Sequence, residues 1–197
     1  MQSFTAARVI TANETDLISW AKNGDRNAFS ELVCIHAEGV RNVIYRMCGD
    51  VQIAEDAAQE TFIQAWLHLA SYRTQASFRS WLYRIAVNAA IDMLRKEKRI
   101  LPGSLEDLQL KDSQPGPEAR FAQEEQASLI QKAIISLPEA CRVVLVLREY
   151  EEMAYQEIAD TLNIPVGTVM SRLNYARKVL RDKLERNLLL QVEAENV

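Results

Sequence analysis

The chain has 197 residues, of which 48% are hydrophobic and 25% are charged, and this composition predicts a soluble, folded protein of one or two domains. Six glycines, five prolines and the lack of a long apolar run argue against collagen-like, low-complexity and membrane-inserted proteins. A formal net charge of -4 is unfavourable for binding nucleic acid unless the basic residues are clustered along the chain.

Apolar residues at helical spacing predict a series of helices in the first half of the chain. We expect them over residues 14–22, 26–38 with a continuation after Gly39, 53–69 and 78–98. The breaks between them carry residues typical of helix ends, namely Asn23-Gly24-Asp25, Gly49-Asp50, and Ser77 as the cap of the last helix. This half is therefore expected to be a helical bundle.

The second half begins with a linker and continues as helices. Residues 101–117 hold three of the five prolines and show no sustained periodicity, which indicates a flexible linker. A helix is expected first over residues 118–135. The next helix should have Ser136 as its cap and Pro138 in its first turn, and two more are expected over 155–162 and from Val166. The run Val143 to Leu147 is β-prone in isolation, but it has no partner strand and is interpreted as a buried helical segment. The predicted fold class is all-α, with two helical domains joined by a flexible linker.

Cysteine and histidine are too sparse for a disulfide framework, a metal centre or a typical active site. Cys34, Cys48 and Cys141 are scattered and odd in number, so we expect reduced thiols. Cys34 and His36 lack a second close pair and do not have zinc-finger spacing. The second histidine is His68, and no glycine-rich phosphate loop is present. We therefore expect no metal, no cofactor and no enzymatic activity.

The N-terminus lacks the features of a secretory signal, because residues 1–12 have neither a basic start nor a continuous apolar core. A cytoplasmic protein without membrane insertion of its own is expected.

Basic residues gather in two islands, residues 71–99 and 166–186, while acidic stretches precede and separate them. Because electrostatic attraction to phosphate is local at a screening length of about 8 Å, the two islands indicate two separate contacts with a polyanion.

The second basic island has the pattern of a helix-turn-helix. Residues 155–162 place Ile158, Ala159 and Leu162 on one face, and after Asn163-Ile164-Pro165 a second helix turns Val169, Leu173, Ala176 and Leu180 inward. Its outer side is predicted to face DNA and carries Thr168, Met170, Ser171, Arg172, Asn174, Tyr175, Arg177 and Lys178. An ordinary helical hairpin with a solvated basic face is the alternative.

The first basic island interleaves cations with aromatic residues over residues 77–88. Cations hold a phosphate backbone and aromatic rings stack on exposed bases, so this segment fits DNA that is being opened or is single-stranded. Simple core packing of Phe78, Trp81, Leu82 and Ile85 is the competing interpretation, and spacing does not separate the two.

Four collinear segments resemble the extracytoplasmic-function (ECF) sigma factors of the sigma-70 family. They are AEDAAQETFIQAW (54–66), FRSWLYRIAVN (78–88), SLP (136–138) and PVGTV (165–169). The resemblance implies a sigma region 2 over residues 14–99, a linker over 100–117 and a region 4 over 118–186, followed by a tail over 187–197 to which we assign no function. It also implies a promoter-specificity subunit that binds core RNA polymerase, recognises minus-ten and minus-thirty-five elements and helps to melt the promoter of a stress or signal regulon.

Carried over residue by residue, the resemblance assigns core-polymerase binding to Asp56, Gln59, Glu60, Phe62 and Trp66. Acidic and amide groups around an apolar anchor suit a basic helical partner. The alternative is a solvated acidic helix face, with Phe62 and Trp66 buried in the core of the chain itself.

The resemblance also assigns the DNA contacts. Asn88 matches the position that helps to hold a base flipped out of the minus-ten element, with the loop 70–77 forming part of the pocket. The minus-ten residues are Tyr72, Arg73, Arg79, Tyr83, Arg84, Asn88, Arg95 and Lys96. The helix from Val166 then reads the minus-thirty-five element, although Met170 stands where a basic residue is usual and Asn174-Tyr175 replaces a commonly aromatic-basic pair. These departures predict a weaker salt dependence and an altered sequence preference.

Two-site binding requires the domains to separate. The two promoter elements lie about 25 base pairs apart, roughly 85 Å, whereas the linker spans at most about 60 Å. A compact form should not bind a promoter, and we expect an anti-sigma factor that clamps the domains or covers both basic surfaces. A conventional regulator with a sensing domain and a dimeric helix-turn-helix is the competing class of function, and residues 54–88 discriminate because only a sigma factor needs them for polymerase.

Overall fold

The computed structural model describes residues 13–73, 76–100 and 118–195, and for residues 97–100, 118–125 and 187–195 it describes the backbone helix alone. Within these ranges every regular element is helical, so the predicted all-α fold class is confirmed. Almost all of the predicted linker, 100–117, lies outside the described residues.

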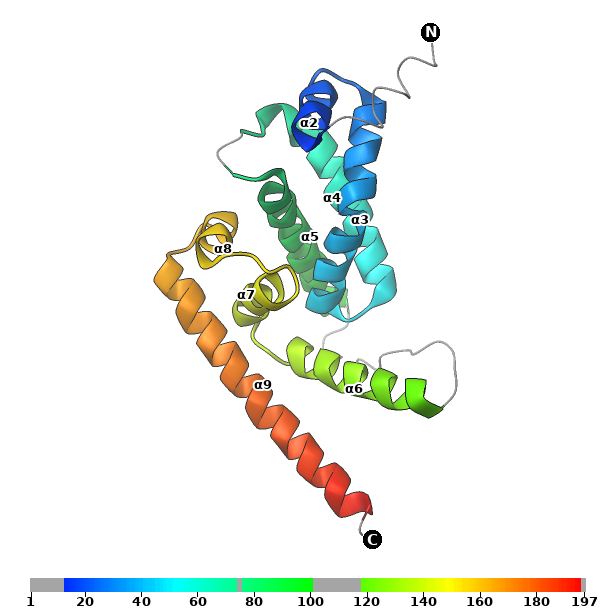
Figure 1. Ribbon diagram of the computed structural model, residues 1–197, viewed down its shortest axis with the longest axis vertical. Coiled ribbons are helices and arrows are strands. Elements are labelled where there is room, and N and C mark those ends of the chain that lie inside the picture. The colour runs from blue at the N-terminus through cyan, green and yellow to red at the C-terminus, as the bar shows by residue number, and fades with distance from the viewer. Residues whose placement is uncertain (1–12, 74–75, 101–117, 196–197) are drawn as a thin grey trace.

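The N-terminal half is a bundle of α2 (Glu14–Lys22), α3 (Arg26–Cys48), α4 (Val51–His68), the short 3-10 turn η1 (Leu69–Ser71) and α5 (Phe78–Ile100) (Figure 1). Side chains cap the helices as the sequence predicted. Asp25 accepts hydrogen bonds from the backbone N–H groups of residues 27 and 28, Asp50 accepts one from residue 53, and Ser77 accepts one from residue 80. Gly39 does not interrupt α3, which ends at Gly49 in a left-handed conformation with φ of 78°.

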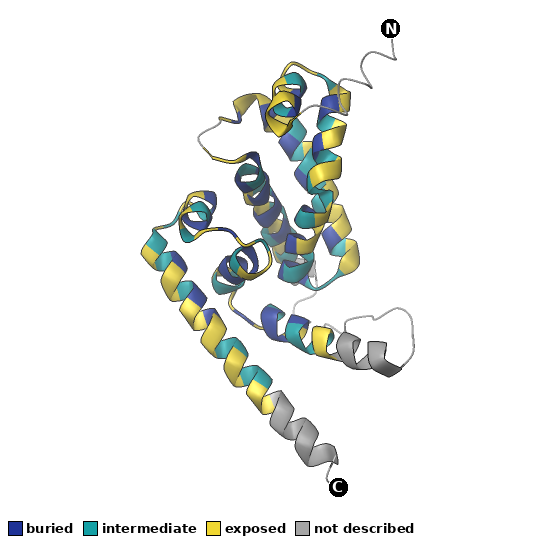
Figure 2. Cartoon of the chain, in the orientation of Figure 1, coloured by how far each residue is buried: buried dark blue, intermediate teal, exposed yellow. Residues whose placement is uncertain are grey.

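The core of this half lies between α3, α4 and α5. Leu32, Ile44, Met47 and Leu82 are fully buried in it (Figure 2). Small residues on α4, such as Ala54, Ala57 and Ala65, are also buried and let the three helices approach closely.

The C-terminal half consists of α6 (Glu118–Ile135), α7 (Glu139–Glu149), α8 (Tyr155–Leu162) and α9 (Val166–Glu195). The run Val143 to Leu147 is helical and entirely buried, which confirms its interpretation as a core helix segment. Asn163 ends α8 at φ of 53° and Val169, Leu173 and Ala176 of α9 are buried, as a helix-turn-helix requires. The helix continues to Glu195, so most of the segment set apart as a tail, 187–197, prolongs α9.

One predicted cap is wrong. Ser136 does not cap α7, because its hydroxyl donates to the carbonyl of Ala133 at 2.6 Å and closes the end of α6 instead. Pro138 takes the N-cap position of α7 without a side-chain hydrogen bond. Pro138 fixes the backbone at the start of α7, and the serine serves the preceding helix.

The two halves pack against each other through α6 and α7 on α3 and through α8 on α5. Arg142 of α7 donates to the carbonyl of Met47 at the end of α3 and to two carbonyls of its own half, those of Ile135 and Leu137. Gln131 of α6 accepts from Arg46 at 2.8 Å and donates to the carbonyl of Tyr45 at 3.1 Å. The chain is therefore in a closed arrangement, with the C-terminal helices seated on the N-terminal bundle.

Candidate functional site

The outer face of α4 carries the acidic and amide residues predicted to bind a protein partner. Asp56 and Gln59 are exposed and Glu60 is partly exposed. Gln52 donates to Asp56 at 3.3 Å, and Gln64 donates to Glu60 at 2.7 Å, so amide side chains hold both carboxylates along the helix surface. The helix itself packs against α3, α5 and η1.

The apolar residues on this face are not the ones that the sequence reasoning selected. Phe62 and Trp66 turn toward the core, and the ring of Trp66 lies 4.9 Å from that of Phe29. Ile63 and Leu67 point outward instead, with exposed fractions of 54% and 64%. Helical spacing shows the signal that was missed, because residues 56, 59, 63 and 67 form one stripe on α4. We call Asp56, Gln59, Glu60, Ile63 and Leu67 the α4 outer face.

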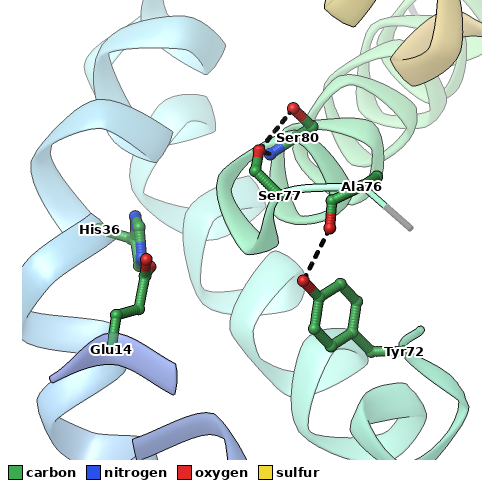
Figure 3. A network of polar contacts seen from close by, with 6 residues as sticks. All are labelled: Glu14, His36, Tyr72, Ala76, Ser77 and Ser80. Atoms are coloured by element: carbon green, nitrogen blue, oxygen red, sulfur yellow. Dashed lines mark hydrogen bonds and ion pairs between the residues drawn. The ribbon is translucent and has the colours of Figure 1, made fainter. Parts of the chain in front are cut away.

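The loop before α5 is built around Tyr72 (Figure 3). Its hydroxyl donates to the carbonyl of Ala76 at 2.8 Å, and its ring lies 5.5 Å from Phe78 and 5.2 Å from Trp81. Burial raises the pKa of Tyr72, and the charge of Glu14 raises it further. Tyr72 was predicted to contact DNA, but the structure places it in the base of the loop, while Arg73 is exposed.

Residues of α2 and α3 also support this loop. His36 lies 2.6 Å from a carboxylate oxygen of Glu14, and its ring is 5.4 Å from that of Phe78 (Figure 3). Ser77 and Ser80 share a hydrogen bond of 2.8 Å at the start of α5. These contacts fix the position from which α5 leaves the loop.

The cationic and amide residues of α5 are distributed along one solvent-facing side. Arg84, Asn88, Arg95 and Lys96 are exposed, and Arg79 is half-buried with its guanidinium 5.9 Å from the ring of Tyr83. One of these cations is already in reach of the other half, because Arg95 lies 3.8 Å from Glu139 of α7.

Tyr83 does not share this exposure, although the sequence grouped it with the DNA contacts. It is 3% exposed, and its hydroxyl donates to the carboxylate of Glu151 in the turn between α7 and α8. Burial and this hydrogen bond raise the pKa of Tyr83, and burial also raises the pKa of Glu151. In the closed arrangement Tyr83 is therefore part of the contact between the two halves.

The predicted DNA-reading side of α9 faces solvent over most of its residues. Those with high exposure are Met170, Ser171, Asn174, Tyr175, Arg177 and Lys178, while Thr168 and Arg172 are half-buried. The Ser171 hydroxyl donates to the carbonyl of Thr168 at 3.0 Å. Arg177 pairs with Glu149 of α7 at 2.6 Å, and this hydrogen bond raises its pKa.

A cavity of about 260 Å³ separates α5 from the helix-turn-helix. Arg84 and Asn88 from the predicted minus-ten surface and Arg172 from the predicted minus-thirty-five surface line it together. Its remaining wall is largely apolar, with Val87, Ile91, Val143, Leu162 and Ile164. The closed arrangement thus turns parts of both predicted DNA surfaces toward one space.

In the ranges that the structure describes, no three histidine, cysteine or acidic side chains gather as a metal site would need. The helices within those same ranges include none that is both long and apolar enough to span a bilayer.

Two family models match this chain. The model of Sigma-70 region 2 matches residues 32–100, and the model of Sigma-70, region 4 matches residues 127–180. The first match covers the α3–α5 bundle except the start of α3, and the second covers the end of α6, α7, α8 and the first half of α9.

Similar proteins agree with these matches over most of the chain. The chain is 37% identical to the ECF RNA polymerase sigma factor SigW of Bacillus subtilis, over 85% of this chain and 94% of that protein. It is 36% identical to the RNA polymerase sigma-H factor of Pseudomonas aeruginosa, over 87% and 94%. Identity to the ECF RNA polymerase sigma-E factor of Escherichia coli K12 is 35%, over 86% and 93%.

Two solved structures share the fold. One is CnrH in complex with the cytosolic domain of CnrY, with a TM-score of 0.66 and 24% identity over 86% of this chain and 96% of that chain. The other is the sigma factor RpoE in complex with the anti-sigma factor NepR from Bartonella quintana, with a TM-score of 0.63 and 21% identity over 80% and 96%.

Proposed function

This chain belongs to the extracytoplasmic-function sigma factors of the sigma-70 family, a promoter-recognising subunit of RNA polymerase, and we propose which of its surfaces carries each part of that function. The family assignment decides against the competing class, a conventional regulator with a sensing domain. We further propose that the protein works in the cytoplasm, has no catalytic activity of its own, and uses residues 14–99 as region 2 and 118–186 as region 4.

Core polymerase binds the α4 outer face in this proposal. The observation that carries it is the exposure of Ile63 and Leu67, which continue a row of carboxylates and amides toward the end of α4. Exposed apolar side chains beside acidic groups favour a helical partner that offers an apolar contact next to basic residues. The resemblance assigns Phe62 and Trp66 to the same interface. In this proposal they act indirectly, because they pack on the core side of α4 and fix it against α3.

Promoter DNA binds the exposed sides of α5 and α9. On α5 the proposed contacts are Arg79, Arg84, Asn88, Arg95 and Lys96, with Arg73 from the loop. Asn88 can both donate to and accept from a base edge, which suits a flipped base of the minus-ten element. Tyr72 contributes indirectly by holding the loop in place, because its hydroxyl donates to the carbonyl of Ala76.

The minus-thirty-five element is read by the start of α9. Arg172 and Asn174 have side chains that can read base edges in the major groove, and Arg177 and Lys178 suit phosphates. Thr168 lies in the first turn of α9, where helix-start amides favour phosphate, and Ser171 follows in the second turn. Met170 and Tyr175 add exposed apolar and aromatic surface in the same row.

An anti-sigma factor is the third proposed partner. The RpoE structure that shares this fold contains the anti-sigma factor NepR. In this chain Arg84 and Asn88 of one proposed DNA surface and Arg172 of the other line one cavity, so a partner bound over it would cover part of both surfaces.

Transcription in vitro tests the proposed function. Core RNA polymerase is incubated with a genomic promoter library, with and without the protein, and the start sites are mapped. Asn88→Ala and Arg172→Ala should each reduce initiation about tenfold, since a base contact contributes about 1–3 kcal/mol. Arg41→Ala and Asn42→Ala, at exposed positions on α3, are the matched controls and should leave initiation unchanged. A protein that binds DNA and never directs initiation would not fit this function.

A further inference from the structure

We propose that α2 positions the loop that forms part of the pocket for the minus-ten element, with Lys22 and Glu14 as its positioning residues. The inference rests on the proposed function and deepens it, because it names side chains that decide how this loop is held. We call residues 70–77 the minus-ten loop, of which the structure describes all but 74 and 75. The region 2 model begins to match at residue 32, so α2 lies before the matched segment.

Lys22 holds the start of the minus-ten loop. Its ammonium group donates a hydrogen bond to the backbone carbonyl of Tyr72 at 2.5 Å and lies 5.1 Å from the centre of the Tyr72 ring. Tyr72 is where the chain leaves η1 for an extended conformation, and a carbonyl beyond a helix end needs a donor from another segment. A cation forms a strong hydrogen bond and also attracts the face of an aromatic ring, so Lys22 restrains both the backbone and the side chain of Tyr72.

The direction of Arg73, a proposed DNA contact, follows from this hydrogen bond. The carbonyl of Tyr72 and the N–H of Arg73 belong to one planar peptide group. When Lys22 fixes that carbonyl, it also fixes the plane from which the backbone continues into the exposed Arg73. Lys22 can therefore affect a DNA contact without touching DNA itself.

Glu14, at the other end of α2, supports the end of the minus-ten loop through His36. Its carboxylate lies 2.6 Å from Nε2 of His36, whose side chain is only 10% exposed (Figure 3). The His36 ring lies 5.4 Å from the ring of Phe78, the first residue of α5. Because a partner at one ring nitrogen restrains the orientation of an imidazole, Glu14 holds the His36 ring where the loop enters α5.

The two supports are joined across the loop by Tyr72. Its hydroxyl donates to the carbonyl of Ala76 at 2.8 Å (Figure 3), and its ring lies 5.5 Å from that of Phe78. The negative charge of Glu14 reaches Tyr72 as well, where it adds to burial in raising the pKa of the phenol. A helix of nine residues thus holds the start and the end of the loop as one unit.

A general contribution to folding is the alternative role for Lys22 and Glu14. Lys22 is an exposed residue, and the Glu14 side chain is 46% exposed. Exposed side chains change the stability of a protein little when they are replaced. The two roles also differ in their consequences, because a positioning residue changes the base preference at one promoter element, whereas a loss of folding lowers initiation at all promoters alike.

The experiment uses holoenzyme assembled from the full chain and core RNA polymerase. Lys22→Met removes the ammonium group and keeps a long side chain, Lys22→Arg keeps a cationic donor, and Glu14→Ala removes the partner of His36. Lys132→Met and Glu31→Ala make the same changes at exposed positions of α6 and α3 and are the matched controls. Transcription from the promoter library gives each variant's discrimination between bases at every position of the minus-ten and minus-thirty-five elements.

Lys22→Met should lower the discrimination at the most strongly preferred minus-ten base about fivefold, since a well-placed base contact discriminates by roughly 5- to 100-fold. Lys22→Arg should stay within about twofold of the wild type, because it restores a charged donor. Glu14→Ala should lower the discrimination about threefold, as expected for an exposed pair that acts through a second side chain. Discrimination at the minus-thirty-five element and affinity for core polymerase should stay unchanged in every variant.

Hydrogen exchange of the free chain measures the loop without transcription. The N–H of Tyr72 donates to the carbonyl of Leu69 at 3.1 Å. Lys22→Met should speed exchange of this amide about fivefold relative to Lys132→Met, because a segment that has lost a contact opens more often. The midpoint of thermal unfolding should move by less than about 3 °C.

Three results would overturn the inference. They are a minus-ten discrimination of Lys22→Met equal to that of Lys132→Met, a Lys22→Arg variant as impaired as Lys22→Met, and a loss of initiation that is equal at all promoters. The proposed function is judged by the wild type alone. A wild type that directs initiation while Lys22→Met changes nothing loses only the role of α2. A wild type that never directs initiation loses the proposed function, and the exchange rate of the Tyr72 amide then decides whether α2 holds the loop.

Discussion

The α4 outer face and the facing sides of α5 and α9 differ in exposure in the closed arrangement. Ile63 and Leu67 stand free in solvent, while Arg84, Asn88 and Arg172 line one cavity between the halves. Under the assignments proposed above, the polymerase contacts are open to solvent in the closed arrangement, whereas these three DNA contacts line the space between the halves. The difference predicts that polymerase can bind before the two regions separate.

The largest expected effect is on the binding of core polymerase to the α4 outer face. Replacing both Ile63 and Leu67 with Asp should weaken binding to core polymerase on the order of 100-fold or more, because each side chain at the centre of an interface contributes about 2 kcal/mol. Val51→Asp, at an exposed valine in the first turn of α4, is the control and should bind like the wild type. Fluorescence titration with core polymerase gives the affinities. Equal binding by the double variant would contradict the assignment of this face.

Arg142 ties region 4 to region 2 in the closed arrangement. Arg142→Ala leaves the carbonyls of Met47, Ile135 and Leu137 without their donor and should reduce the free energy of unfolding by about 2–3 kcal/mol. Arg142→Lys should recover only part of this loss, because an ammonium group lacks the guanidinium fork. Thermal unfolding measures the change, and Arg181→Ala at an exposed position of α9 is the control. The affinity for core polymerase should stay unchanged, since the α4 outer face does not depend on Arg142.

Met170 tests the DNA surface of region 4 by charge alone. Met170 is 48% exposed in the predicted row of DNA contacts, where a basic residue is usual in the family. Met170→Arg should add one phosphate contact and steepen the dependence of log affinity on log salt by about 0.9. Val51→Arg adds the same charge on α4 and should leave the slope as it is. A slope that steepens equally in both variants would place the effect in net charge and not in the DNA surface.

The smallest expected effect is a pH dependence at Glu151. Burial raises the pKa of Glu151 in the closed form above its ordinary value of 4.5, so the closed form holds more protons than the open one. Its contribution to closure is fully present below pH 4.5 and is lost as pH rises through the raised pKa. The difference in unfolding free energy between the wild type and Glu151→Gln should therefore shift with pH across this window. A difference that is constant with pH would show that Glu151 has the same pKa in both states.

Local sequence signals predicted the helices well, because caps and breaks are set by neighbours along the chain. Asp25, Asp50 and Ser77 cap the helices that they were expected to cap. Ser136 failed for a reason of the same local kind, since a serine between two helices can serve either of them and Ala133 offered a carbonyl.

The candidate site was less predictable from sequence. Tyr72 and Tyr83 were grouped with the DNA contacts because the resemblance assigned them there, but both are buried in the structure. Phe62 and Trp66 were chosen as apolar anchors, while Ile63 and Leu67 are the apolar residues that reach solvent. Helical periodicity sorts residues into faces, and it does not say which face another helix covers.

The sequence by itself determined the fold class, the helix-turn-helix and the family, because these depend on periodicity, capping residues and motif order along the chain. Only the tertiary structure decided that Arg84, Asn88 and Arg172 line one cavity and that Tyr83 is held by Glu151, 68 positions along the chain. The physical reason is that contacts between distant segments follow from packing two completed helical units, with Gly39 leaving space for the Tyr83 hydroxyl. No pattern within either unit carries that information.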